Sequence, residues 1–452
     1  EYKDHIVYEG KTKTLYLRVL RAIYGCLESA LLWYNLYSST LEKIGFKLNP
    51  YDQCVANKII NGKQCTIVFY VDDNKISHED PSVVTEVIDE ISKYFGKLKV
   101  VRGKAHDFLG MNIKLLGGNK FSISMKEQIK QAIEWLGEDI NNDATSPATK
   151  GLFEVDESSK QLDDHKSEIF HSVVAKLLYI CKRARPDIEV PVAFLCTRVS
   201  KSTEEDWKKL KRVLAFLNGT IDDVRIIGAT SLATLFAWVD AAYGVHNDLK
   251  SHTGGAMLLG IVIVHSKSSK QKLNTKISTE AELGGVSDYL PYSLWARMFL
   301  EEQGFKMKNI LFQDNQSAIY LEKNGKGSST GNTRHINIRY FFIKDRVSKG
   351  EIEVLYCPTT SMLGDFYSKP LQGELFRYYR AILMGHVSIE EIIHRTLKMK
   401  ECVGENSISS KYDSRLIFKM DEQNKKLTET EKMKEWGRTG SNDVAKKVRT
   451  VG

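Results

Sequence analysis

ATLFAWVD, residues 233–240, is the most informative stretch of this chain, because an apolar run stops there at an acid. Three later segments also place an acid beside an apolar run: Glu282 in STEAEL (278–283), Asp314 in NILFQD (309–314) and Asp365 in MLGDFYSKPL (362–371). Acids gathered at strand ends can hold two divalent metals about 4 Å apart for cutting or joining phosphodiesters. We therefore expect Asp240, Glu282, Asp314 and Asp365 to converge in a two-metal site.

Strands alternate with helices from residue 232 to residue 375, which is typical of a mixed α/β domain. The expected strands are LFAWVD, GGAMLLGIVIVHS (254–266), NILFQD and EIEVLYC (351–357). Helices are expected near Thr279, near Gln316 and after Pro358. Pro291 should break or kink the first of these helices.

Each of the four acids also has a structural explanation that needs no metal. Asp240 and Asp314 can cap helices that follow a strand. Thr279 and Glu282 form the T-x-x-E pattern of a capping box. Asp365 can be a solvated position on a short helix. The four acids together, in the order strand, helix start, strand and late helix, favour the metal site.

Residues 1–143 mix helix and strand around a second acidic motif. The expected elements are a helix entered after Gly25, a hairpin around the turn NGK (61–63), a helix that ends at Gly96, and a strand pair around Gly117 and Gly118. TIVFYVDDNKIS (66–77) places Asp72 and Asp73 between two apolar arms. An acidic turn alone explains the pair, since Asp and Asn favour turns. The apolar arm before it favours instead a buried strand that presents two carboxylates to magnesium.

The remaining segments show no chemistry of their own. Residues 144–228 combine a turn-rich linker with two amphipathic helices. The second helix places five apolar residues on one face: Trp207, Leu210, Val213, Leu214 and Leu217. Residues 386–452 are rich in Lys, Glu, Ser and Asn, and we expect a weakly ordered tail.

Composition indicates a folded protein with some attraction to polyanions. The 452 residues suffice for two or three domains, and 42% of them are hydrophobic. The net charge is +8, from 65 basic and 57 acidic residues, which is compatible with binding phosphate backbones. The seven cysteines include no CxxC pair, which favours a reduced intracellular protein without zinc or disulfides. We expect no membrane span and no secretory leader.

The order and spacing of four motifs resemble the reverse transcriptase of copia-type LTR retrotransposons. They are RAIYGCLESALLWY (21–34), NPYDQCVANK (49–58), YVDD (70–73) and FLGMNI (108–113). The resemblance implies that Asp72 and Asp73 are catalytic, metal-binding aspartates of a polymerase. It also implies that Phe108 and Gly110 belong to a hairpin that grips the primer. Residues 26–28 depart from the family pattern, which often has an LKQ-type tripeptide there.

The polymerase of this family uses a third metal-binding aspartate on a strand well before the YG helix. The residues before Tyr24 include no apolar strand that ends in Asp, and Asp4 is a poor candidate. We therefore expect that the beginning of the polymerase is missing and that this chain alone does not polymerise DNA.

A second set of motifs resembles the ribonuclease H of the same family. It comprises WVDAAYG (238–244), SHTGGAMLLG (251–260), SKQKLNTKISTEAEL (269–283), QDNQSAI (313–319), TRHINIRYFFIKD (333–345) and GDFYSKPLQG (364–373). The resemblance implies that Asp240, Glu282, Asp314 and Asp365 are catalytic ligands of Mg²⁺, or of Mn²⁺ in its place, with Glu280 as the fallback for Glu282. The implied reaction is attack of water on an RNA phosphodiester within an RNA/DNA hybrid.

Basic residues near this expected site are candidates for nucleic-acid binding. Four of them form a basic strand before the expected catalytic helix: Lys267, Lys270, Lys272 and Lys276. They either protect an edge strand or contact phosphates along the hybrid. The family string at 333–345 adds Arg334 and His335, although a polar surface histidine explains His335 equally well.

These observations predict an α+β partial polymerase palm and thumb region (1–143), connecting helices (144–228), a mixed α/β ribonuclease H-like domain (229–385) and a tail. The leading interpretation is a retrotransposon polyprotein fragment that binds RNA/DNA hybrids and primer–template nucleic acid. Integrase and protease regions would lie upstream in the parent, and the location would be cytoplasmic, in virus-like particles, or nuclear. The alternative is a decayed or domesticated remnant that binds nucleic acid without cutting it.

Overall fold

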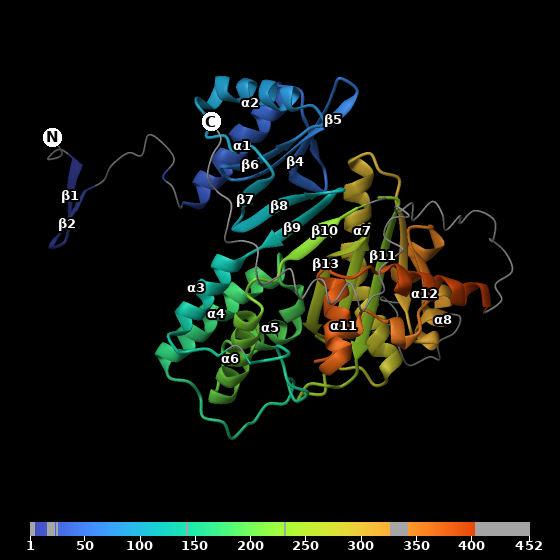
Figure 1. The fold of residues 1–452 in the computed structure, drawn as a ribbon. Coiled ribbons are helices and arrows are strands. Elements are labelled where there is room, and N and C mark those ends of the chain that lie inside the picture. Colours follow the sequence, from blue (N-terminus) through green and yellow to red (C-terminus); the bar gives the residue numbers. More distant parts are fainter. Residues whose placement is uncertain are drawn as a thin grey trace, which may run out of the picture. The chain divides into compact units, whose positions relative to one another are not determined.

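The computed structural model describes residues 5–15, 23, 26–141, 143–229, 232–325 and 342–402. These residues fall within one contact unit, 1–404, and form four β-sheets (Figure 1). The smallest sheet is a hairpin of β1 (Ile6–Glu9) and β2 (Thr12–Leu15). In the part of the chain that the structure describes, no helix is long and apolar enough to cross a membrane.

The second sheet is antiparallel, with the strand order β3-β4-β5-β6. Its elements are β3 (Lys47–Asn49), β4 (Asp52–Ile60), β5 (Lys63–Tyr70) and β6 (Asp73–Ser77), with the helices α1 (Leu27–Lys43) and α2 (Pro81–Phe95). Buried residues of both helices and of β5, such as Leu41, Val87 and Ile67, share one core. The predicted turn is confirmed, since Asn61 and Gly62 have φ values of +53° and +75°, which suit a two-residue hairpin.

The third sheet has the order β10-β9-β8-β7. Its elements are β7 (Ala105–Phe108), β8 (Met111–Gly117), β9 (Lys120–Ser124) and β10 (Arg225–Gly228), and α3 (Lys126–Leu136) follows β9. The predicted strand pair at Gly117 is therefore present. The strand β10 was not predicted: the chain returns after α3 and three further α-helices, and Arg225 pairs with Ile123 of β9.

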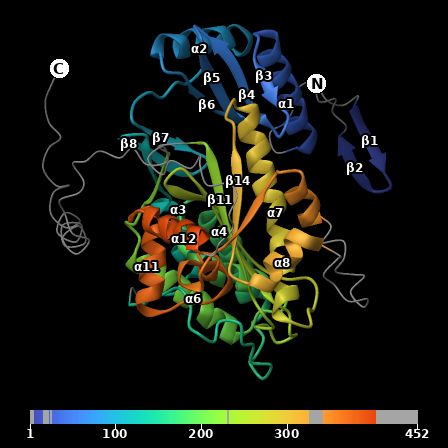
Figure 2. The same ribbon diagram turned by 90° about the vertical axis from the view of Figure 1, so that its right-hand side faces the viewer.

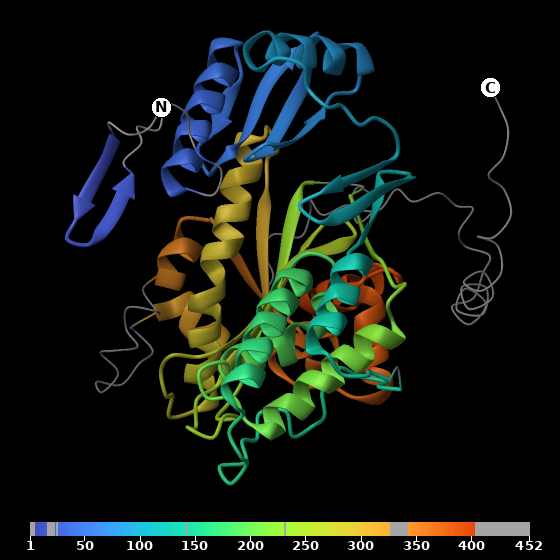
Figure 3. The same ribbon diagram turned by 90° about the vertical axis from the view of Figure 1, so that its left-hand side faces the viewer.

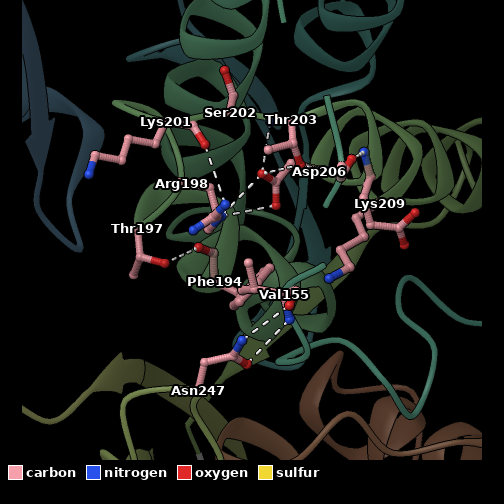
Figure 4. A network of polar contacts seen from close by, with 12 residues as sticks. Val155, Phe194, Thr197, Arg198, Lys201, Ser202, Thr203, Asp206, Lys209 and Asn247 are labelled. Atoms are coloured by element: carbon pink, nitrogen blue, oxygen red, sulfur yellow. Dashed lines mark hydrogen bonds and ion pairs between the residues drawn. The ribbon is translucent and has the colours of Figure 1, made fainter. Parts of the chain in front are cut away.

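The three α-helices between α3 and β10 are α4 (Asp164–Cys181), α5 (Glu189–Cys196) and α6 (Glu204–Gly219). The apolar face predicted for α6, from Trp207 to Leu217, is buried. Figure 4 shows the network of polar contacts at the start of α6. Thr203 and Asp206 form a capping box there, and Arg198 Nε donates to Asp206 Oδ2 at 3.1 Å. This network ties the end of α5 to the beginning of α6.

The fourth sheet is mixed, with the order β13-β12-β11-β14-β15. Its strands are β11 (Thr234–Ala242), β12 (His252–Leu259), β13 (Val262–Lys270), β14 (Lys308–Gln313) and β15 (Glu353–Tyr356). β11, β12 and β13 pair antiparallel, whereas β14 runs parallel to β11 and β15 runs parallel to β14. The long helix α7 (Ser278–Glu302) lies beside β11 and β14 (Figure 2). It buries Leu283, Val286 and Leu290 against Val239 and Leu311.

The remaining helices cover this sheet and its ends. They are α8 (Gln316–Asn324), a helical stretch over residues 342–348, α10 (Asp365–Ser368), α11 (Gly373–Leu383) and α12 (Glu390–Cys402), with a short 3₁₀ turn at Thr359–Ser361. The sequence predicted a weakly ordered tail from residue 386. α12 differs from this expectation over its own length, because Ile392 and Ile393 on the helix and Ile389 directly before it are buried.

One other prediction for this region is wrong, and a second is wrong in part, because Pro291 does not break its helix. The segment GGAMLLGIVIVHS is two strands, because Gly260, with φ +68°, turns the chain between β12 and β13. Pro291 does not end its helix, and α7 continues through it as one helix (Figure 3). Leu290 and Leu294 are buried on either side of the proline, and their packing offsets the hydrogen bond that proline cannot donate.

Candidate metal centre

Three acids from three elements meet at one edge of the mixed sheet. Asp240 lies on β11, Glu282 near the start of α7, and Asp314 directly after β14. Each offers one oxygen, and the three oxygens lie within 4.8 Å of one another. The parallel strands β11 and β14 are neighbours, so their carboxyl ends reach the same edge, and α7 packs against β11. The structure thus brings together the three acids that the sequence predicted to converge.

Glu282, and not the fallback Glu280, belongs to this cluster. The Glu280 carboxylate accepts a hydrogen bond from the Lys276 backbone N–H at 2.7 Å, so it closes the turn before α7. The Glu282 carboxylate accepts a hydrogen bond from Gln313 Nε2 at 3.3 Å. The T-x-x-E capping box is not formed, because Ile277 is the N-cap of α7 and no side chain caps it.

The helix-cap explanations for Asp240 and Asp314 do not hold either. Asp240 lies inside β11, which continues to Ala242. The N-cap of α8 is Asn315, whose side chain accepts a hydrogen bond from the Ala318 N–H at 3.0 Å. Asp314 accepts a hydrogen bond from Thr359 Oγ1 at 3.1 Å instead.

The fourth acid, Asp365, is the first residue of the short helix α10, and it lies close to Asp240 of β11. Asp365 is only 9% exposed, so it is not a solvated position. Its Oδ1 accepts a hydrogen bond from Lys369 Nζ at 2.6 Å, and the same nitrogen lies 3.3 Å from Asp240 Oδ2. Ser368 Oγ also donates to Asp240 Oδ2. Helix α10 therefore brings an acid, a hydroxyl and an ammonium group to Asp240.

Two glycines allow α10 to lie this close to the sheet. Gly254 is opposite Asp240 in the β11–β12 pairing, and a Cβ there would lie 2.3 Å from Gly364 O and 2.4 Å from Ser368 N. A Cβ on Gly364 would lie 2.8 Å from Asp240 N. A larger side chain at either position requires α10 to move away from Asp240.

Burial and mutual repulsion raise the pKa of three of these acids. Burial, followed by the charges of Asp240 and Asp314, holds the pKa of Glu282 well above its usual range. Burial and Asp240 also raise the pKa of Asp314, and they raise that of Asp365 to about 7. A divalent cation favours the ionised forms, and carboxylate oxygens are the ligands that Mg²⁺ and Mn²⁺ prefer. The donor set therefore fits such a cation.

Known proteins that are similar in sequence to this chain are polyproteins of retrotransposons, the class of element that the motifs also resemble. The "Retrovirus-related Pol polyprotein from transposon TNT 1-94" of Nicotiana tabacum is 25% identical over 382 residues, which is 83% of this chain and 28% of that protein. The transposon RE1 polyprotein of Arabidopsis thaliana is 27% identical over 366 residues, 80% of this chain and 24% of that protein. The Ty1-GR2 Gag-Pol polyprotein of Saccharomyces cerevisiae is 24% identical over 380 residues, with 80% and 21% covered.

The chain is a distant homologue of the copia- and Ty1-type Pol polyproteins. It spans 28% or less of the length of these three relatives. No family model matches it. Among solved structures it is similar to "the foamy viral protease-reverse transcriptase in complex with RNA/DNA hybrid", with a TM-score of 0.45 and 14% identity over 79% of this chain and 42% of that one.

In this Pol homologue, the two aspartates of the YVDD motif are exposed at the turn between β5 and β6. Val71 in this turn has φ +54°, and its carbonyl accepts a hydrogen bond from Trp33 Nε1 of α1. Among the described residues, the only group of three acids placed to share a metal is the cluster on the mixed sheet. A metal at Asp72 and Asp73 therefore stays a prediction.

The expected primer-gripping hairpin is formed by β7 and β8. Phe108 ends β7, and the turn consists of Leu109 and Gly110, with φ values of +52° and +70°. Tyr179 Oη of α4 donates to Leu109 O at 2.7 Å, which fixes the turn. The contact of Phe108 and Gly110 with nucleic acid stays a prediction.

The predicted basic strand is a strand only in its first half. Lys267 and Lys270 lie on β13, an edge strand of the sheet, whereas Lys272 and Lys276 lie exposed in the loop before α7. Lys267 Nζ lies 4.7 Å from the centre of the Tyr292 ring, and Lys270 pairs with an aspartate at 2.9 Å. The other two candidates, Arg334 and His335, lie outside the described residues.

The sequence analysis missed the side chains that hold the acids. Gln313, Thr359, Ser368 and Lys369 each donate to one of the four carboxylates. A signal was available for two of them, because Ser368 and Lys369 follow Asp365 by three and four residues and so share a side of one helical turn. Thr359 has no comparable signal, since its contact with Asp314 depends on the path of the chain after β15.

Proposed function

We propose that this chain carries a metal-dependent ribonuclease that cleaves the RNA strand of RNA/DNA hybrids. Asp240, Glu282, Asp314 and Asp365 would hold two divalent cations, Mg²⁺ or Mn²⁺. The observation that carries the proposal is the convergence of the first three acids within 4.8 Å, with the fourth joined to Asp240 through Lys369. Bound cations of this kind activate a water molecule and steady a leaving 3′-oxygen.

The arrangement of elements supports a ribonuclease H-like fold for residues 229–385. Three antiparallel strands are followed by a helix, two further parallel strands and terminal helices. The acids come from a strand, a helix, a strand end and a late helix, as the family resemblance implies. Gln313, Thr359 and Ser368 orient three of the carboxylates by hydrogen bonds, so the site is held before any substrate binds.

We further propose that the sheet β3-β6 is part of the palm of a polymerase within a longer Pol polyprotein. Its support is the position of Asp72 and Asp73 at the turn between two paired strands. In such a polyprotein the primer–template would contact this turn and the β7–β8 hairpin, with magnesium at the two aspartates. RNA-directed DNA synthesis is then an activity of the complete polyprotein.

The nuclease proposal is tested with Asp314→Asn and a control, Asp345→Asn, at an aspartate that pairs with Lys349 outside the cluster. Cleavage of a labelled RNA/DNA hybrid in Mg²⁺ should fall at least about 100-fold in Asp314→Asn, because one lost metal ligand removes several kcal/mol of charge stabilisation. The control should cleave as the wild type does. Circular dichroism should show both variants folded.

Two outcomes would contradict the nuclease. One is undiminished cleavage in Asp314→Asn. The other is a wild-type protein that binds the hybrid but leaves the RNA intact in both Mg²⁺ and Mn²⁺, which would favour the non-catalytic remnant.

A further inference from the structure

The four carboxylates divide into two unlike groups that share Asp240. In the first group, Asp240, Glu282 and Asp314 each offer one oxygen within 4.8 Å of the others. Glu282 and Asp314 accept hydrogen bonds from the neutral donors Gln313 and Thr359. In the second group, Asp240 and Asp365 are bridged by the ammonium of Lys369. The ammonium of Lys369 thus contacts both carboxylates of the second group but only Asp240 among the three carboxylates of the first group.

The short helix α10 determines the position of Lys369. Lys369 follows Asp365 by four residues, so the side chains of both reach the same side of α10. Its partners are almost completely buried, with Asp240 and Asp365 side chains 3% and 13% exposed, while the Lys369 side chain is 40% exposed. The ammonium therefore enters the cluster from the solvent side on a flexible stem that can also leave it.

An ammonium group and a divalent cation compete for the same carboxylate oxygens. Two positive charges a few ångströms apart repel strongly in a half-buried site. A cation on the pair Asp240–Asp365 must therefore displace Lys369 from both of its carboxylates, whereas a cation among Asp240, Glu282 and Asp314 meets Lys369 at Asp240 alone and gains two carboxylates that the ammonium does not contact.

We propose that Lys369 is a resident counter-cation for the pair Asp240–Asp365, so that this protein takes up its two divalent metals in a fixed order. The first metal binds the three acids of β11, α7 and β14. The second binds Asp240 and Asp365 only when Lys369 leaves, and the metal concentration needed for this step sets the threshold for activity. The inference rests on the proposed two-metal function and adds a positioning residue to it.

The test is a titration of the full chain with Mn²⁺. Calorimetry measures the affinity of each Mn²⁺ ion, and electron paramagnetic resonance detects spin-coupled pairs of Mn²⁺. The wild type should bind one Mn²⁺ at least about tenfold more tightly than a second one, because only the second must displace the ammonium from both of its carboxylates. In Lys369→Met the second ion should bind at least about tenfold more tightly than in the wild type, and coupled pairs should form at lower Mn²⁺. Lys369→Arg keeps a cation and should keep the ordered binding.

A matched control is Lys349→Met. Lys349 also pairs with an aspartate four residues before it, Asp345, at 2.8 Å, but outside the cluster. This variant should bind Mn²⁺ as the wild type does. Circular dichroism checks that the variants fold, and Lys369→Gln replaces Lys369→Met if the methionine variant does not.

The outcomes separate this inference from the function on which it rests. If the wild type binds no Mn²⁺, or if Asp314→Asn leaves the tighter binding unchanged, the proposed metal centre is wrong and the order of binding with it. If the wild type binds Mn²⁺ through Asp314 but Lys369→Met binds the second ion no more tightly than the wild type, only the role of Lys369 is overturned.

Discussion

Ionisation of Asp365 should make the metal-free protein less stable as the pH rises. Its pKa is raised from 3.8 to about 7, so between these values the folded chain binds a proton that the unfolded chain has lost. Stability contributed by this group is therefore present at low pH and is lost as the pH rises through 7. In EDTA, the melting temperature of the wild type should fall between pH 5 and pH 7.5 by about 3 °C more than that of Asp365→Asn.

Mg²⁺ provides the control for this pH effect. A divalent cation favours the ionised carboxylates, so it should raise the melting temperature more at pH 7.5 than at pH 5. Equal pH profiles of the wild type and Asp365→Asn in EDTA would show that the folded environment does not hold a proton on Asp365.

Glu322 of α8 is a second buried acid, and it has no role in the cluster. It is 0% exposed, neither carboxylate oxygen has a hydrogen-bond partner among the residues that the structure describes, and burial raises its pKa to about 8. Glu322→Met should therefore stabilise the protein by about 1–3 kcal/mol in urea unfolding at pH 7. The gain should grow as the pH rises from 5 to 8, because the wild type loses stability over that range.

The control for this change is Glu134→Met, at an exposed position of the helix α3. It should alter the free energy of unfolding by less than about 0.5 kcal/mol. A loss of stability in Glu322→Met would mean that the carboxyl group makes a contact that the structure lacks.

The acids themselves could be predicted from the sequence, but the groups around them could not. Each acid interrupts or follows an apolar run, which is visible in the chain. The sequence did not show that these acids are not helix caps: Asn315 takes the cap position for which the sequence analysis considered Asp314. Likewise, nothing in the sequence shows that Thr359 reaches Asp314, because that contact joins segments 45 residues apart.

The spacing between β12 and α10 controls how the fourth acid reaches the cluster. Gly254→Ala would place a Cβ 2.3 Å from Gly364 O, so α10 must move and carry Asp365 and Lys369 away from Asp240. We expect hybrid cleavage to fall at least about tenfold and the melting temperature to decrease.

Gly285→Ala is the matched control in α7. Its added Cβ would lie 3.4 Å from Thr253, an ordinary van der Waals distance, and it should keep both activity and stability. A fully active Gly254→Ala variant would show that α10 can shift without disturbing the cluster.

A largely buried ion network holds α11 against residues 183–188, RARPDI, which follow α4. Arg185 makes two hydrogen bonds of 2.9 Å to Asp187, and Arg380 of α11 makes a third of 2.8 Å. Burial alone would raise the pKa of Asp187, but the two guanidinium groups hold it well below its usual range. Asp187→Asn leaves the buried Arg185 without a carboxylate partner and Arg380 with Asp223 alone, and it should cost about 3–5 kcal/mol in urea unfolding.

The exposed pair of Lys126 and Asp222 supplies the comparison for Asp187. Asp222→Asn removes a carboxylate whose side chain is 80% exposed and should cost less than about 1 kcal/mol. Equal costs for the two variants would contradict the view that burial makes the Asp187 network important.

Element types were easier to predict from the sequence than element ends. Apolar periodicity located α6, and the NGK turn located β4 and β5, because both signals are local. Gly260 lies inside one continuous apolar run, so the sequence predicted a single strand where the structure has β12 and β13. Pro291 suggested a helix break, but the helix continues because residues on both sides of the proline pack against β11 and β14. No local sequence pattern reveals this packing.

Charge acts across the molecule as well as at the cluster. The chain carries a net charge of +8, and the loop before α7 adds two exposed lysines beside the acids. Tyr243 Oη, three residues after Asp240, donates to Lys276 O at 2.8 Å, which holds this loop close to the cluster. An RNA/DNA hybrid bound at the four acids would therefore lie next to the loop that carries Lys272 and Lys276.

This placement predicts which lysines neutralise phosphates. Lys272 and Lys276 have no acid partner among the described residues, whereas Lys270 pairs with Asp248 and Lys267 contacts Tyr292. The slope of log binding constant against log salt concentration, measured for an RNA/DNA hybrid in Ca²⁺, should lose about 1.5–2 units in Lys272→Gln/Lys276→Gln. The control pair Lys267→Gln/Lys270→Gln should lose less than about half as much, because these ammonium groups are already engaged. Equal losses would mean that net charge alone, and not the loop, decides how this chain holds nucleic acid.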